Sequence, residues 1–462
     1  GIPQYRLPKE IVEKEVQLIA DLGVEMRNNV YIKNTADACV GPQVTETVTL
    51  EDLRKEYNAV IVAVGAWQSS KVGCPGEDAE GVIGGIDFLR HNILGTPDNI
   101  GKSVAIVGGG NTAMDACRSA VRLGAENVYV IYRRTRAEMP ADDEEITQAI
   151  EEGVTFKFLT NPAEIISENG HVTAVKLQVM ELGEPDASGR RSPVPVEGKF
   201  ETLEVNTVIA AIGQKVIPLP GLELNKKGII AADEFSYRTN LNNVFAIGDA
   251  TNKGASIAIE AIGEGQKCGE VVDSFLTIND GDREGVDLIP YHKPFYSERN
   301  LDNVKKELAE RPKLPRLQYK LRPAEERKKD FDDIVISASD EEIQTEAKRC
   351  LECGCWDYKD CRLIQCANCD AICPERLKGE YHPGFEETLL VSIERNQKKC
   401  ISCNLCVRVC DEVAGKGILG LVGRGFTTII KPEFNKPETI ACCKDCHKCA
   451  DACPTGALKI LK

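Results

Sequence analysis

Two runs of cysteine near the C-terminus constrain the fold of this chain more than any other feature. Each run has the spacing C-x2-C-x2-C-x3-C, and the second run ends in Cys-Pro. In chains with this spacing, the first three thiolates of a run bind one [4Fe-4S] cluster and the fourth binds the other cluster. The spacing therefore predicts one cluster at Cys400, Cys403, Cys406 and Cys453. It predicts a second cluster at Cys443, Cys446, Cys449 and Cys410.

Zinc sites or disulfides are the alternative explanation for this cysteine content. Zinc sites usually combine two short C-x2-C units, whereas here a complete four-cysteine run is repeated. Of the 20 cysteines, 16 lie between Cys350 and Cys453. Thiolates that bind iron must stay reduced, so the distribution predicts a cytoplasmic, oxygen-poor setting and not a secreted, disulfide-linked protein.

Seven further cysteines precede the two runs, and they predict one or two additional [4Fe-4S] clusters at residues 350–373. They are Cys350, Cys353, Cys355, Cys361, Cys366, Cys369 and Cys373. The last three repeat the end of a cluster-binding run. Because seven thiols are one short of two four-cysteine clusters, either one cluster forms beside free thiols or His382 or Cys442 supplies an eighth ligand.

A glycine-rich turn follows an apolar run at residues 103–107 and leads into an apolar helix. The turn reads G-x-G-x-x-A, the pattern of a dinucleotide-binding strand–turn–helix unit. The first glycine permits a tight turn, the second lets the backbone approach a pyrophosphate, and the helix N-terminus offers free N–H groups to the phosphates. The predicted nucleotide-binding residues are Gly108, Gly110, Asn111, Thr112 and Ala113.

Three arginines, Arg133, Arg134 and Arg136, follow the next predicted strand at residues 127–132. Enzymes that use NAD place a carboxylate at this point, where it binds the ribose 2′-hydroxyl, whereas arginines can bind a 2′-phosphate. The arginines therefore favour NADP over NAD. Any one of them could instead belong to a solvated basic turn.

Three other apolar runs, at residues 59–64, 207–212 and 243–247, each end in glycine: Gly65, Gly213 and Gly248. Apolar runs of this length are typical of parallel strands that are buried on both faces. Asp249 places a carboxylate where a ribityl hydroxyl of a flavin could be bound. Ile257, just before the next predicted helix, completes the candidate flavin-binding residues.

Charge and hydropathy limit the possible partners. The net charge of −15 makes nucleic acid an unexpected partner. No apolar run approaches the ~18 residues of a membrane span. Residues 279–345 are rich in charge and proline, which predicts an extended linker.

Taken together, these motifs resemble the glutamate synthase small-subunit family of NADPH-dependent flavoproteins. That family includes the large subunit of the electron-bifurcating ferredoxin:NADP transhydrogenase. The similarity rests on residues 1–8, 108–115, 132–141, 211–214 and 247–249. The C-terminal module is similar to the two-cluster ferredoxin domains of iron-only hydrogenases and of complex I-type subunits.

The resemblance implies an α/β fold with two Rossmann-like domains of the pyridine nucleotide-disulfide reductase type. The expected parts are 1–94, part of an FAD-binding domain; 95–210, an NAD(P)-binding domain; 211–278, the remainder of the FAD-binding domain; 279–345, the linker; 346–385, a Cys-rich iron–sulfur segment; and 386–462, a ferredoxin-like domain with two [4Fe-4S] clusters. The family's N-terminal G-x-G-x-x-G unit, which binds the FAD pyrophosphate, is absent from this sequence. We expect a longer polypeptide or another chain to supply it.

The implied function is that of an electron-transfer subunit that moves electrons between NADP(H), FAD and a chain of [4Fe-4S] clusters. Its partners are expected to be other subunits of a redox complex, with ferredoxin, a hydrogenase, a formate dehydrogenase or a bifurcating transhydrogenase partner at the far end. No catalytic acid or base is expected, because the cofactors carry the chemistry. The alternatives are a glutamate synthase small subunit and a flavin-free iron–sulfur relay or scaffold subunit.

Overall fold

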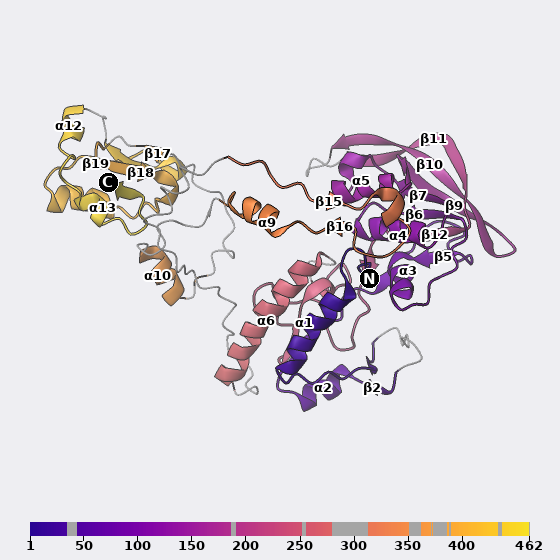
Figure 1. The fold of residues 1–462 in the computed structure, drawn as a ribbon. Coiled ribbons are helices and arrows are strands. Elements are labelled where there is room, and N and C mark those ends of the chain that lie inside the picture. The colour runs from indigo at the N-terminus through magenta and orange to yellow at the C-terminus, as the bar shows by residue number, and fades with distance from the viewer. Residues whose placement is uncertain are drawn as a thin grey trace. The chain divides into compact units, whose positions relative to one another are not determined.

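The computed structural model describes residues 1–34, 44–185, 191–251, 256–279, 313–350, 362–370, 372, 386–387, 390–432 and 437–461. The chain forms two compact units, shown as ribbons in Figure 1. The first unit contains Gly1–Pro290 and Gln318–Ala338, and the second contains Tyr291–Leu317 and Ser339–Lys462. Each unit is described by itself.

A parallel sheet with the strand order β5-β12-β6-β7-β8 carries the predicted nucleotide motif in the first unit. Its strands are β5 (Val82–Gly84), β6 (Ser103–Val107), β7 (Asn127–Tyr132), β8 (Thr155–Phe158) and β12 (Thr207–Ala210). The connecting helices include α3 (Gly85–Ile93), α4 (Asn111–Arg122) and α5 (Asp143–Glu151). This alternation of parallel strands and helices confirms the predicted α/β fold.

Strand β6 is apolar throughout because both of its faces are covered. Val104 and Ile106 belong to one core cluster, together with residues of α4 and α5. Ala105 and Val107 belong to a second cluster, which includes Val175 of β10. Helices lie on one face and an antiparallel sheet on the other, as expected for a continuous apolar strand.

The antiparallel sheet has the order β11-β10-β9. Its strands are β9 (Thr160–Glu168), β10 (His171–Pro185) and β11 (Arg191–Glu204). β11 is mostly exposed and pairs with β10 over a long register from Ala174↔Glu204 to Pro185↔Arg191.

A separate two-stranded sheet pairs β3 (Val60–Val62) with β14 (Val244–Ala246) in parallel. The expectation that this strand is buried on both faces is wrong, since Ile61 is 41% exposed. Within the described residues, β14 pairs with one edge of β3, and the face of β3 that carries Ile61 is open. Two helices of the same unit also expose apolar side chains: α1 (Lys9–Asp21), at Leu18, and α6 (Ala258–Asn279), at Ile262.

Short elements complete the first unit. They are the strand pairs β1 (Val30–Ile32) with β2 (Glu46–Val48), β4 (Gln68–Ser69) with β13 (Gln214–Lys215), and β15 (Lys320–Leu321) with β16 (Val335–Ile336), the helices α2 (Leu50–Glu56) and α8 (Ala324–Arg327), and the 3-10 turns at Arg136–Glu138 and Gly248–Ala250.

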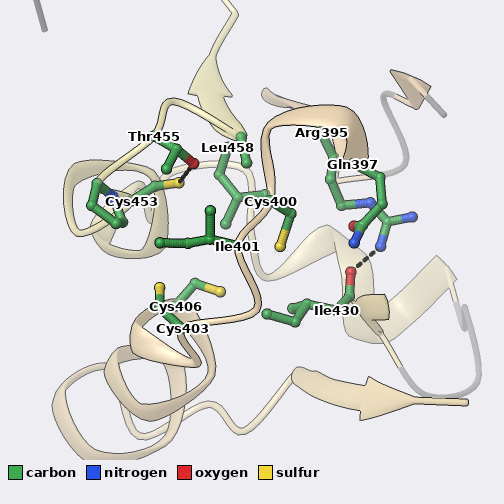
Figure 2. Close-up of a pocket in the computed structure, with 12 residues that line it drawn as sticks. Arg395, Gln397, Cys400, Ile401, Cys403, Cys406, Ile430, Cys453, Thr455 and Leu458 are labelled. Atoms are coloured by element: carbon green, nitrogen blue, oxygen red, sulfur yellow. Dashed lines mark hydrogen bonds between the residues drawn. The ribbon is translucent and has the colours of Figure 1, made fainter. Parts of the chain in front are cut away.

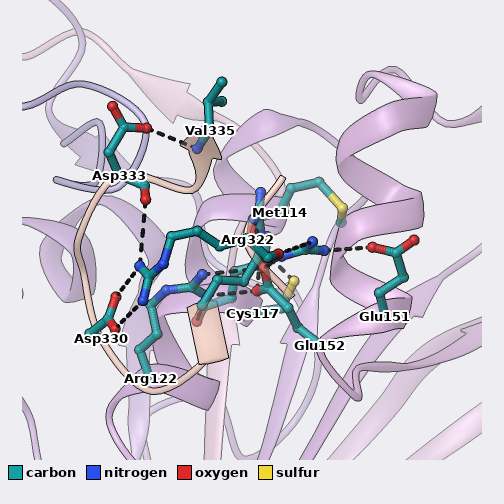
Figure 3. A network of polar contacts seen from close by, with 11 residues as sticks. Met114, Cys117, Arg122, Glu151, Glu152, Arg322, Asp330, Asp333 and Val335 are labelled. Atoms are coloured by element: carbon teal, nitrogen blue, oxygen red, sulfur yellow. Dashed lines mark hydrogen bonds and ion pairs between the residues drawn. The ribbon is translucent and has the colours of Figure 1, made fainter. Parts of the chain in front are cut away.

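Residues 318–338, which the sequence assigned to the linker, pack onto the first unit through a buried ionic network (Figure 3). Glu152, at the end of α5, accepts hydrogen bonds from Arg118 and Arg122 of α4 at 2.8 and 2.6 Å. Arg327 of α8 donates to Glu152 at 2.9 Å and to Glu151 at 2.6 Å. This part of the predicted linker is therefore a fixed part of the folded unit.

The second unit is built from short elements. They are α9 (Asp340–Ala347), α10 (Arg362–Cys369), β17 (Glu386–Glu387), β18 (Ile393–Asn396), α11 (Leu405–Arg408), β19 (Leu419–Val422), β20 (Ile429–Pro432), α12 (Pro437–Ala441), α13 (Lys448–Asp451) and β21 (Leu458–Ile460), with 3-10 turns at Gln397–Lys399 and Gly425–Thr427 and a π-helical turn at Val409–Val413. Strands β17, β18 and β21 form one sheet, and β19 pairs with β20. The core of the second unit contains buried cysteines that pack among aliphatic side chains such as Leu390 and Ile418.

None of the described helices is both long and apolar enough to cross a membrane.

Candidate functional site

The structure brings the first predicted set of four cysteines around one small pocket in the second unit (Figure 2). Cys400, Cys403 and Cys406 come from the loop and first turn of α11, and Cys453 comes from the segment after α13. The wall between the thiols is largely apolar and includes Ile401, Ile430 and Leu458. Cys453, which is distant in the sequence, therefore lies beside the three cysteines with which the spacing rule grouped it.

The backbone of the C-x2-C-x2-C loop curls around this pocket. Ser402 and Asn404 both adopt left-handed backbone conformations, with φ of 54° and 64°. Such conformations are uncommon for residues other than glycine. The N–H of Ser402 donates to Cys400 Sγ at 3.4 Å, the type of contact that lowers the charge on a ligating thiolate.

The second predicted set surrounds a separate pocket of the same kind. Cys410, Cys443, Cys446 and Cys449 line it, together with Leu390, Ile418 and Leu419. Cys410 lies in the π-helical turn, a local distortion that is frequent at functional sites. Its Sγ accepts a hydrogen bond from the N–H of Ile418 at 3.3 Å.

Two buried thiols of these pockets, Cys406 and Cys449, are poorly suited to ionise without a metal. Burial, and then the neighbouring thiols, raises the pKa of Cys406 to about 12. The same causes raise the pKa of Cys449 to about 12. Cys406 and Cys449 belong to the same core cluster, so the two pockets are near neighbours. Metal binding would supply the positive charge that stabilises the thiolates.

Four thiols are the donor type that an iron–sulfur cluster takes, so the residues of each pocket are compatible with one. Among the described residues, no three possible ligands converge closely enough to hold one metal ion. Each pocket instead presents four thiols around a shared space. That arrangement is what a multi-atom cluster with cysteine ligands requires.

Only part of the cysteine group at residues 350–373 can be located. Cys350 is exposed, as are Cys366 and Cys369 on α10. The N–H of Leu363, at the start of α10, donates to the carbonyl of Pro454 at 3.4 Å, so this helix lies beside the first pocket. The other members, Cys353, Cys355, Cys361 and Cys373, and the alternative ligand His382 lie outside the described residues. The additional clusters stay a prediction.

In the first unit, the glycine-rich turn lies between β6 and α4. Gly108 has a φ of +142°, and a Cβ on it would lie 2.2 Å from the carbonyl oxygen of Ala211, so only glycine fits. Gly110 has an ordinary φ of −96°, and a Cβ on it would meet only Pro140 at 3.9 Å. The space beside Gly110 and the start of α4 is thus open to a ligand.

The remaining predicted residues of this turn begin α4. Asn111 is exposed, Thr112 is half-buried and Ala113 is fully buried against the sheet. The backbone N–H of Ala113 is bonded to Gly110, within the first turn. Asn111 and Thr112 therefore stand at the open end of the helix, where a phosphate would meet the helix dipole.

The three arginines of the predicted 2′-phosphate site have different surroundings. Arg133 is exposed at the end of β7. Arg134 Nε donates to the carbonyl of Arg191 at 2.9 Å, which joins the start of β11 to this turn. Arg136 forms an ion pair with Asp143 at 2.7 Å and donates to Thr147 at 2.7 Å. Arg133 and Arg134 are the better candidates for binding a phosphate.

A cavity of about 910 Å³ opens in the first unit between the segment after β3 and the end of β12. Val64 and Gly65 after β3, Trp67, and Ala210 at the end of β12 line it. Gly65 has a φ of +68°. Gly213 has a φ of +123°, and its carbonyl accepts from the N–H of Ser70, another residue on the cavity wall. The cavity is large enough for a planar aromatic cofactor.

Gly248, Asp249 and Ile257 lie at the end of β14 and before α6. Because β3 and β14 are parallel, the segments after them emerge at the same sheet edge. The carboxylate of Asp249 accepts from the N–H of Ser256 at 3.0 Å. The N–H of Gly248 donates to Glu264 at 2.7 Å. Ile257 is 51% exposed. These residues lie at the edge that a flavin would occupy.

Residues 3–265 match the family model described as pyridine nucleotide-disulphide oxidoreductase. The chain belongs to this family. Membership of the pyridine nucleotide-disulphide oxidoreductases confirms the predicted oxidoreductase class and the predicted dinucleotide-binding fold. The match ends before the cysteine-rich part of the chain, so the ferredoxin-like nature of that part stays a prediction.

Curated relatives of this pyridine nucleotide-disulphide oxidoreductase include two that are named as complex subunits. The NADP(+)-dependent formate dehydrogenase subunit beta of Moorella thermoacetica is 37% identical over 366 residues, 76% of this chain and 48% of that protein. The NADPH-Fe(3+) oxidoreductase subunit beta of Geobacter sulfurreducens is 34% identical over 393 residues, 76% of this chain and 55% of that protein. The chain therefore spans about half the length of these relatives.

A third relative is the glutamate synthase [NADPH] small chain of Escherichia coli. It is 35% identical over 298 residues, which cover 60% of this chain and 60% of that protein. The predicted resemblance to the glutamate synthase small-subunit family is confirmed by this similarity.

Sequence reasoning missed Arg395 and Gln397, which line the first cysteine pocket. Arg395 lies two residues after Ile393 on β18, so the two side chains share one face of the strand. This spacing could have indicated that Arg395 faces inward, as Ile393 does. Sequence reasoning also missed that the start of β11 lies beside the nucleotide turn, where Arg134 donates to the carbonyl of Arg191.

Proposed function

We propose that this chain is an electron-transfer subunit of an oxidoreductase complex and that it moves electrons between NADP(H), FAD and [4Fe-4S] clusters. One observation carries the proposal. A single chain combines a glycine-turn nucleotide site on a parallel sheet with two pockets that each gather four cysteines. Nucleotide chemistry transfers two electrons, and such clusters transfer one, so the pairing suits a redox relay.

In this proposal the residues divide into three binding tasks. Gly108, Gly110 and the start of α4 bind the nucleotide pyrophosphate, and Arg133 with Arg134 binds the 2′-phosphate. The cavity beside Gly65 and the edge at Gly248–Ala250 take part of a flavin. The eight cysteines of the two pockets bind two clusters. A bound flavin would supply the exchange between two-electron and one-electron transfer.

The chain's own side chains need no acid or base for this function. Their task is to hold the nicotinamide end of the nucleotide toward the cavity and to keep water away from the buried thiols. The NAD(P)-binding part is proposed to span residues 95–210, between the two parts of the FAD-binding domain. Because iron-bound thiolates must stay reduced, a cytoplasmic location fits the proposal.

The partners are proposed to be other subunits of a redox complex. The names of the formate dehydrogenase and Fe(3+) oxidoreductase relatives support a role as a beta-type subunit. Ferredoxin, a hydrogenase, a formate dehydrogenase subunit or a bifurcating transhydrogenase partner would receive or supply the electrons. A glutamate synthase small subunit is the alternative, but the two four-thiol pockets lie beyond the region matched to the nucleotide-oxidoreductase family.

The second candidate is a flavin-free iron–sulfur relay subunit. It is favoured by the open face of β3, where Ile61 is exposed. An absorbance spectrum of the anaerobically purified chain, with and without its co-purifying partners, separates the two. A flavin band that bleaches on addition of NADPH supports the electron-transfer enzyme. Cluster absorbance that does not respond to NADPH supports the relay.

A further inference from the structure

The first cysteine pocket contains two buried polar side chains that are not cysteine. Gln397 is 1% exposed and Arg395 is 3% exposed, and both line the pocket together with the four thiols (Figure 2). The amide nitrogen of Gln397 has no hydrogen-bond partner in the described part of the chain. A buried donor without an acceptor destabilises the fold. Such a group therefore calls for an explanation, such as a ligand that accepts its hydrogen bond.

Arg395 is held in place from the opposite wall of the pocket. Its Nη1 donates to the carbonyl oxygen of Ile430, which is itself a wall residue. This contact fixes the guanidinium near the thiols. The positive charge of Arg395 is therefore a permanent feature of the pocket.

The second cysteine pocket lacks an equivalent pair among the residues that line it. Its polar side chains are Lys416 and Lys448, and both residues are exposed. Lys416 donates to the carbonyl of Cys442, and Lys448 donates to the carbonyl of Val413 at 3.2 Å. Charges that reach solvent are screened, whereas buried charges are screened much less.

We propose that Gln397 donates an N–H···S hydrogen bond to a cluster held by Cys400, Cys403, Cys406 and Cys453 and, with Arg395, makes this cluster the more easily reduced of the two. The inference rests on the proposed function, since it requires clusters in both pockets. Reduction adds one electron and breaks no bond, so the reduced cluster is more negative. A hydrogen-bond donor and a buried cation stabilise that added charge and raise the reduction potential.

A higher reduction potential of the first cluster would determine where a single electron rests. The first pocket adjoins α10 through the bond from Leu363 to Pro454, and α10 carries Cys366 and Cys369. An electron shared between the two clusters would therefore rest on the side of the additional cysteines.

The experiment is a redox titration of the full chain with dithionite under anaerobic conditions, monitored by electron paramagnetic resonance. Cys406→Ser and Cys449→Ser assign each signal to its pocket. Gln397→Met removes the donor at similar volume and should shift the first cluster's one-electron equilibrium about tenfold toward the oxidised form, about 59 mV lower. Lys416→Met is the matched change at the second pocket and should leave the first potential unchanged.

Iron content and the second cluster's potential separate tuning from a structural role. The inference holds if Gln397→Met keeps the iron content and lowers only the first potential. It is overturned if the first potential does not move. If Gln397→Met loses iron, the isosteric Gln397→Glu is titrated, and the inference is overturned if that variant also loses iron or keeps the wild-type potential. A wild-type chain that binds no iron overturns the proposed clusters, and this inference with them.

Discussion

Arg327 Nε donates to Glu152 Oε1 at 2.9 Å, although the two residues are 175 positions apart in the sequence. Glu152 is 2% exposed and also binds Arg118 and Arg122 of α4. Helix α4, whose first turn is the predicted nucleotide site, is thus tied at its far end to the segment that leads into the second unit. The guanidinium carbon of Arg122 lies over the ring of Tyr5, 4.1 Å from the ring centre, so Tyr5 also packs against this network.

Arg327→Ala should destabilise the first unit by about 1–3 kcal/mol, the usual contribution of a buried hydrogen bond to a charged group. Two arginines would still compensate Glu152, so complete unfolding is not expected. Chemical denaturation of the full chain measures the effect. Lys328→Ala is the control, because Lys328 pairs with the exposed Glu325. Equal stability of both variants would contradict a role for Arg327 in holding this segment.

The same network predicts acid sensitivity. Burial alone would raise the pKa of Glu152, but hydrogen bonds from Arg118 and Arg122 outweigh it and lower the pKa from 4.5 to about 2. A carboxylate with a lowered folded-state pKa contributes stability above pH 4.5 and loses it as the pH falls toward 2. The loss should reach about 3 kcal/mol. Unfolding free energies between pH 5 and pH 2 test this, and Glu152→Gln should flatten that dependence.

The two glycines of the nucleotide turn should respond differently to alanine. Gly108→Ala forces a Cβ to 2.2 Å from a backbone oxygen, so the variant should fold poorly. Gly110→Ala has room in the folded chain and should keep the wild-type melting temperature, yet block the approach of a pyrophosphate. Calorimetry of NADPH binding beside thermal unfolding distinguishes them. Wild-type NADPH affinity in Gly110→Ala would argue against nucleotide binding at this turn.

The double variant Arg133→Ala, Arg134→Ala should weaken NADPH binding about 10- to 100-fold and affect NADH little, because charge-assisted bonds to a 2′-phosphate contribute about 1.5–3 kcal/mol. Arg136→Ala is the matched control, since Arg136 is engaged by Asp143 and Thr147. Dissociation constants for both nucleotides provide the measurement. An equal loss for NADPH and NADH would reject the 2′-phosphate assignment.

Cys406→Ser and Cys453→Ser should remove the same cluster, because both residues line the first pocket. Each variant should lower the iron at the two pockets from about eight to about four atoms per chain. NADPH-dependent reduction of flavin should persist in both. Cys74→Ser, which changes a cysteine of the first unit, should keep all the iron. If Cys453→Ser instead abolished the signal lost in Cys449→Ser, the crossed arrangement would be wrong.

Apolar runs and glycine positions predicted the strands and the helix around the nucleotide turn, because these elements depend mainly on local sequence. Strands β6 and β7 lie at residues 103–107 and 127–132, as the apolar runs predicted, and helix α4 follows the glycine-rich turn. The cysteine sets were also predictable, because the spacing fixes three ligands and the crossing rule fixes the fourth.

Long-range packing produced what the sequence did not reveal. β11 is polar and mostly exposed, and only its pairing with β10 identifies it as a strand. The docking of α8 depends on ion pairs with Glu151 and Glu152, far away in the sequence. Likewise, Gln397 has no motif that marks it, and its importance appears only when its amide is found beside the thiols.

The crossed cysteines also bear on how the second unit is made. During synthesis, Cys400, Cys403 and Cys406 leave the ribosome well before Cys453, and the first pocket cannot close until Cys453 emerges. The second pocket likewise cannot form around Cys410 until Cys443, Cys446 and Cys449 have been synthesised. Because neither pocket can be completed from one half of the segment, the proposed clusters would be inserted only after the whole segment has been translated.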